Sequence, residues 1–124
     1  MRMQKVRTAR LAAIFAAIAC ASAGSAHEIT ETMATPVRAT LSSPKRPVDL
    51  ELCVADAITQ IGGAVPVPIR DGERNVHMLG YGHTPKIIVS LIASDRGTTI
   101  ELRTKSGDMD DKMVKHLKVA CQIA

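Results

Sequence analysis

Apolar residues recur at helical spacing in two stretches of the chain, one near its middle and one at its C-terminal end. The apolar positions of the first stretch are Leu50, Cys53, Val54, Ala57, Ile58 and Ile61. Those of the second, within 108–122, are Met109, Met113, Leu117, Ala120 and Cys121. Steps of three and four residues place these side chains on one face of a helix. The pattern therefore predicts two amphipathic helices.

Between the two helices the apolar residues alternate with a period of two, which is typical of β-strands. The strand-like segments are 65–70, 75–81, 86–94 and 98–104. The third of them, KIIVSLIAS, is apolar on both faces, as in a central strand. Pro66 and Pro68 make the first an edge or irregular strand, because proline cannot donate to a ladder. Short turns between the segments predict an antiparallel meander of three or four strands.

The order helix, meander, helix predicts a two-layer α+β domain. Cys53 and Cys121 lie on the two predicted helices. A disulfide between them would hold both helices on one face of the sheet. In the chain-entropy model, closing so long a loop stabilises the fold by roughly 4 kcal/mol.

The N-terminal residues have the pattern of a secretory signal peptide. Four basic residues precede the apolar run 11–19, which is too short to span a membrane, and small residues follow it. Cleavage after Ala23 or after Ala26 is chemically acceptable. We therefore expect a signal peptide over 1–26, an extended and partly disordered lead-in over 27–47, and one domain over 48–124. The mature protein is expected in the periplasm of a Gram-negative bacterium or secreted, where a disulfide persists.

Removing the signal peptide changes the charge of the protein. The chain has 16 Lys and Arg against 12 Asp and Glu, and four of the basic residues lie in the signal peptide. The mature domain is therefore close to neutral, which argues against nucleic-acid binding. No second apolar run follows, so no transmembrane segment is expected. Membrane anchoring requires lipidation of Cys20, whose preceding residues, Ala17-Ile18-Ala19, only faintly resemble a lipobox.

The segment HMLGYGH, 77–83, is the most conspicuous candidate for a site. Its two histidines, with His27, form a hypothetical copper or zinc site. Cleavage after Ala26 would make His27 the first residue, and its α-amine and imidazole together chelate copper. The competing interpretation makes the segment a strand end followed by a turn that its glycines permit. No cofactor is expected on this second interpretation.

The sequence lacks a recognisable set of nucleophile, base and orienting residue. Ser90 and Ser94 lie in or at the end of the central strand without a nucleophile-elbow motif, so no enzymatic activity is expected. We expect a small exported binding module, with a protein partner or a second copy as its ligand. The metal-binding protein is the first alternative, and a small hydrolase or isomerase the second.

The expected interaction surface is the sheet face that the two helices leave uncovered. It would carry Leu79, Tyr81, Ile88 and Ile92. The lead-in, a second copy or a partner would have to cover it. Strand addition at 65–69 is a second mode of binding, although the two prolines weaken it.

Intact-mass spectrometry of the exported protein tests the N-terminal interpretation. We expect a chain that begins at Gly24 or at His27, and so no longer contains Cys20, with one disulfide. A mass that includes a diacylglyceryl group on Cys20 would contradict this expectation.

Overall fold

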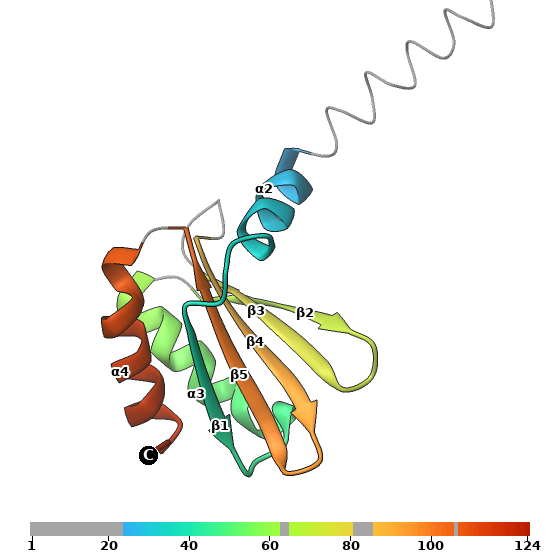
Figure 1. Cartoon of the computed structure of the whole chain (residues 1–124), viewed down its shortest axis with the longest axis vertical. Helices are drawn as coiled ribbons and strands as arrows, with labels where there is room; N and C mark the ends of the chain where they lie inside the picture. The colour runs from blue at the N-terminus through green and yellow to red at the C-terminus, as the bar shows by residue number, and fades with distance from the viewer. Residues whose placement is uncertain (1–23, 63–64, 81–85, 106) are drawn as a thin grey trace, which may run out of the picture.

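A computed structural model describes residues 24–62, 65–80, 86–105 and 107–124 of the chain. Within them one antiparallel sheet is packed on one face by two helices, and a third helix lies across its end (Figure 1). The strands are β1 Ala39–Ser43, β2 Val67–Asp71, β3 Asn75–Gly80, β4 Ile87–Ser94 and β5 Gly97–Thr104. The helices are α2 Gly24–Met33, α3 Pro47–Gly62, the 3-10 turn η1 Gly107–Met109 and α4 Asp110–Ala120. The predicted α+β class is confirmed.

The sheet has the strand order β1-β5-β4-β3-β2, so it contains five strands instead of three or four. Strands β2 to β5 form the predicted meander. Strand β1 comes from the segment that was expected to be an extended lead-in, and it pairs with β5, with Leu41 opposite Ile100. Its short sequence ATLSS has a single large apolar residue. The sequence pattern therefore gave little indication of a strand whose partner lies about sixty residues further along the chain.

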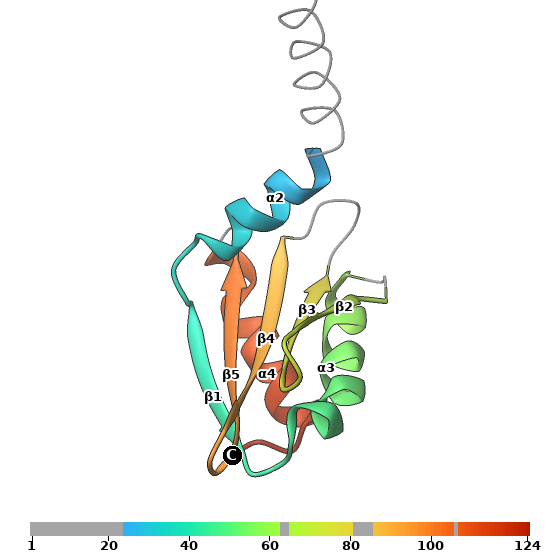
Figure 2. The same cartoon turned by 90° about the vertical axis from the view of Figure 1, so that its right-hand side faces the viewer.

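The N-terminal part of the same lead-in forms α2, which also differs from the expected extended conformation. α2 contacts β4 and β5, and Figure 2 shows it crossing the end of the sheet. Thr32 on α2 is completely buried, and Glu31 forms an ion pair with Lys105 after β5, at 3.4 Å. This helix is therefore positioned by its contacts with the rest of the fold and not by an apolar stripe of its own.

The core lies between the sheet and the pair α3 and α4. Alternate residues of β3, β4 and β5 point into it, with β5 alternating buried and partly buried positions along its whole length. The buried apolar side chains from the helices are Leu50, Val54, Ala57, Ile58, Met113 and Leu117. Those from the sheet are Val76, Met78, Ile87, Val89, Leu91, Ile100 and Leu102.

The disulfide between Cys53 and Cys121 is present and joins α3 to the residue that follows α4. The two Cα atoms are 5.1 Å apart, and the bridge spans 68 residues of sequence. The predicted covalent link between the two helices is confirmed. Both helices lie behind the sheet in Figure 2.

Two turn glycines provide a matched test of this packing. Gly72 and Gly97 both have positive φ, at 71° and 129°. A Cβ on Gly97 would collide with the backbone of Ser43 and Pro44, whereas one on Gly72 would meet nothing within 4 Å. We expect Gly72→Ala to cost about 1 kcal/mol for its conformation alone. Gly97→Ala should cost several kcal/mol, since the β1–α3 connection must move. Urea unfolding measures both, and equal losses would contradict the close approach.

Candidate functional site

The candidate site lies on the sheet face opposite α3 and α4, called here the open face. Figure 2 looks onto this face. Cross-strand pairing aligns its side chains in rows that run across the sheet. One row contains Ile69, His77, Ser90, Glu101 and Thr40, and the next contains Val67, Leu79, Ile88 and Arg103.

The predicted surface residues do not all reach solvent. Leu79 is 8 % exposed and Ile88 is 0 % exposed, so neither presents apolar area to a partner in this arrangement. Ile92 is half-buried, and Tyr81 lies outside the described residues. The expectation of a broad apolar surface was too simple, because Ser90 stands between Ile88 and Ile92 on the same face of β4.

His77 is the centre of a hydrogen-bonded chain on this face. Its Nδ1 lies 2.7 Å from the Ser90 hydroxyl, and its Nε2 lies 3.4 Å from a carboxylate oxygen of Asp71. With the proton on Nε2, the imidazole accepts a hydrogen bond from Ser90 and donates one to Asp71. Beside them, Arg103 forms an ion pair with Glu101 at 3.2 Å. Polar side chains thus cover the middle of the open face.

The chain Ser90–His77–Asp71 has the residue types of a nucleophile, a base and an orienting acid. Its geometry favours a structural role. Ser90 is 0 % exposed and sits in a strand paired on both sides, so a substrate carbonyl cannot reach its oxygen. Asp71 is 71 % exposed and its contact is long, so it holds the imidazole weakly. The histidine satisfies a hydroxyl that would otherwise be buried without a partner.

Sequence reasoning missed this contact. His77 and Ser90 are 13 residues apart and become neighbours only through the β3–β4 register. The alternation along 75–81 did predict that His77 and Leu79 share one face. The sequence therefore indicated the shared face of His77 and Leu79, but it did not indicate the register that pairs β3 with β4.

The structure does not bring the hypothetical metal ligands together. His77 already uses both ring nitrogens, His27 belongs to α2, and His83 lies outside the described residues. Among the described residues, no three His, Cys, Asp or Glu side chains could hold a metal ion. Cys20, the candidate for lipidation, also lies outside them.

Three exposed apolar side chains lie close together in sequence at the β2 edge of the sheet, whereas others, such as Leu52 and Val119, lie on the helices. Val65, Val67 and Ile69 are 79 %, 60 % and 39 % exposed. β2 pairs with β3 on one side only, which confirms the predicted edge. Because a proline in a ladder turns its nitrogen outward, Pro66 and Pro68 leave few donors on the free edge. Val67 and Ile69 pair with Leu79 and His77, so they belong to the open face.

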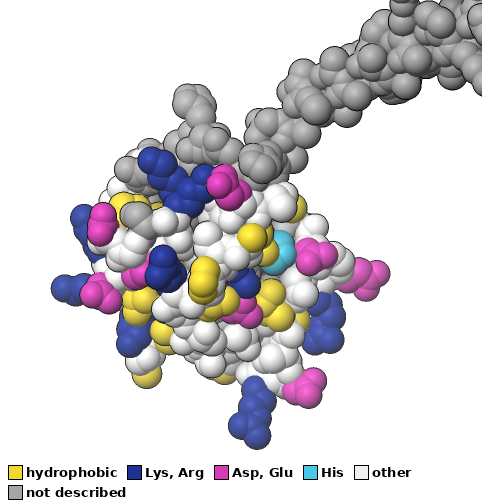
Figure 3. Space-filling model, turned by 45° about the horizontal axis from the view of Figure 1, so that its top comes forward, with side chains coloured by type: hydrophobic (Ala, Val, Ile, Leu, Met, Phe, Trp, Pro, Cys, Tyr) yellow, Lys and Arg dark blue, Asp and Glu magenta, His cyan; other side chains and the backbone are white. Residues whose placement is uncertain are grey.

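The face of the molecule shown in Figure 3 has no dominant charge. On the face shown in Figure 3, basic and acidic side chains are interspersed. No helix in the described part of the chain is long and apolar enough to cross a membrane. This mixture of charges agrees with the equal numbers of basic and acidic residues in 27–124.

Removing the Ser90–His77 hydrogen bond tests its structural role. Ser90→Ala should lower the free energy of unfolding by about 1 kcal/mol, because one buried hydrogen bond is lost. Asp71→Asn is the matched control and should change it by less, since Asp71 is exposed. Urea unfolding of Ser90→Ala, of His77→Ala and of the variant with both substitutions gives the coupling energy. A coupling near zero would contradict the assigned contact.

Comparisons with known proteins add no functional assignment. No family model, no curated protein and no solved structure matches the chain. A functional conclusion therefore depends on the chemistry of the residues described above.

Proposed function

We propose that the protein is a small exported binding module without catalytic activity, which holds a protein partner through β2 and the adjoining open face. The observation that supports this most directly is the exposure of Val67 and Ile69, neighbours on one face of an edge strand. Apolar side chains grouped in this way release free energy when a partner removes them from water.

The surroundings of these two residues suit a protein surface. Asp71 and His77 lie beside Ile69 and supply polar groups around an apolar centre, which is the usual anatomy of an interface. All five residues of β2 are exposed, but its last two, Arg70 and Asp71, are charged. Such a small contact area suits a transient partner better than a permanent one.

Side chains, and not the strand backbone, are expected to make the contact. Strand addition uses the free N–H and C=O groups of an edge. Pro66 and Pro68 remove two of the donors that a new strand would need. A partner that lies across the open face meets Val67 and Ile69 without those donors.

The disulfide supports a location outside the reducing cytosol. Cys53 and Cys121 are at bonding distance, and such bridges persist in the periplasm or in secreted proteins. We therefore place the binding module in the periplasm or outside the cell. The alternative, a copper- or zinc-binding protein using His27, His77 and His83, stays a prediction.

Site-specific photocrosslinking tests the proposed surface. A photoreactive residue replaces Val67 in cells that produce and export the protein. We expect a discrete crosslinked product, which Ile69→Asp in the same chain should reduce by about tenfold, since a charge then faces the contact. The matched control carries the photoreactive residue at Thr40, which is exposed on the same face at the opposite edge.

Mass spectrometry of the product distinguishes a foreign partner from a second copy. Light scattering on the purified protein must show dimers if the product contains only this chain. Identical products from positions 67 and 40, or no product from position 67, would contradict the proposal.

A further inference from the structure

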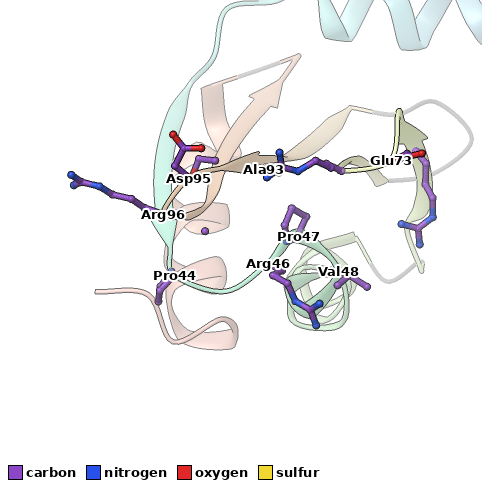
Figure 4. Close-up of a pocket in the computed structure, with 12 residues that line it drawn as sticks. Pro44, Arg46, Pro47, Val48, Glu73, Ala93, Asp95 and Arg96 are labelled. Atoms are coloured by element: carbon purple, nitrogen blue, oxygen red, sulfur yellow. The ribbon is translucent and has the colours of Figure 1, made fainter.

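We propose that a pocket at the end of the sheet opposite α2 binds a small organic anion, a carboxylate or a phosphate ester with a short apolar group. Three segments far apart in the sequence meet there (Figure 4): the start of α3, the β2–β3 turn and the β4–β5 turn. The pocket has a volume of about 540 Å³. Pockets of this size hold small ligands in other proteins.

Arginine side chains are frequent in the lining of the pocket. The lining includes four arginines, Arg46, Arg70, Arg74 and Arg96, against the two acids Glu73 and Asp95. Arginine presents a planar set of donors that matches a carboxylate or phosphate with two parallel hydrogen bonds. A guanidinium group that no carboxylate already holds therefore suits an anion.

Two of these arginines are already held by carboxylates. Arg46 binds Asp49 through two hydrogen bonds of 2.9 and 3.2 Å, and Arg70 forms an ion pair with Glu51 at 2.9 Å. The hydrogen bond from Arg46 lowers the pKa of the exposed Asp49 carboxyl. Both guanidinium groups thus serve as fixed parts of the wall.

Arg74 and Arg96 are the cations that remain for a ligand. Within the described residues neither forms an ion pair, and both are exposed. Figure 4 shows Arg96 extended away from α3. It must turn inward to reach a bound anion, at the cost of some side-chain entropy. Arg74 belongs to the β2–β3 turn and Arg96 to the β4–β5 turn, so two different segments supply the cations for a bound anion.

Other residues of the lining are apolar and would contact the short apolar group of the ligand. Pro44, Pro47, Val48 and Ala93 contribute apolar atoms, and Figure 4 shows Pro47 pointing toward Ala93. Pro47 is the first residue of α3, whose N-terminus carries a partial positive charge. The apolar and cationic parts lie side by side. A ligand with a short alkyl chain next to its anionic group satisfies both.

NMR titration of the full exported chain with butyl phosphate, butyrate and butanol tests the proposal. Both anions should shift the amide signals of 93–97 and 46–48 along saturable curves, with dissociation constants of about 1 mM. Butanol should not saturate, because it lacks the charge. The stronger of the two anions identifies whether a phosphate or a carboxylate is the better ligand.

The matched variants remove equal charge from different places. Arg74→Gln with Arg96→Gln should weaken the binding of the stronger anion by about tenfold or more, since charge-assisted hydrogen bonds are lost. Lys112→Gln with Lys118→Gln, both on exposed positions of α4, should leave it unchanged.

The proposal would be overturned if neither anion gave a saturable curve or if butanol bound as tightly as the anions. It would also be overturned if both pairs of substitutions weakened binding equally. Unfolding in urea confirms that all variants are folded. The result is independent of the proposed partner surface, because Val67 and Ile69 do not line the pocket.

Discussion

The covalent link between α3 and the end of α4 is the constraint on which the arrangement of this protein depends. Cys53 and Cys121 tie the two helices together over a separation of 68 residues. Both apolar stripes must then face the same side of the sheet, where they share one core. The domain is small and its core is limited, so this loss of freedom in the unfolded chain, roughly 4 kcal/mol in the chain-entropy model, adds usefully to its stability. The open face is a direct consequence.

A sheet with helices on one side must dispose of its second face, and this protein does so in three different ways. At one end α2 packs against β4 and β5, and Leu79 and Ile88 are buried on the open face. In the middle, Ser90 is bonded to His77, and Glu101 to Arg103. Among the described residues of the open face, the large apolar side chains that are exposed are Val67 and Ile69 at the β2 edge. The surface that remains for a partner is therefore much smaller than the apolar sequence of β4 suggests.

The two proposed binding surfaces use opposite faces of the same edge strand. Val67 and Ile69 point to the open face, whereas Arg70 points to α3, where it binds Glu51 beside the pocket. Because side chains alternate between the two faces of a strand, the apolar pair and the charged Arg70 lie on opposite faces although they are only a few residues apart. The proposed apolar contact lies on one side and the proposed anion site on the other. The two proposals therefore do not require the same surface.

The sequence by itself determined the helices, the meander, the disulfide and the edge position of β2. Each of these follows from local signals: the spacing of Leu50 to Ile61, the alternation along 98–104, the two prolines and the cysteine pair. The tertiary structure decided the roles of β1 and α2, because both depend on contacts with β5 and β4 far along the chain. It also decided that His77 meets Ser90 and that the start of α3 and two strand turns form one pocket. Register and long-range approach set these distances, and no local pattern of hydrophobicity encodes them.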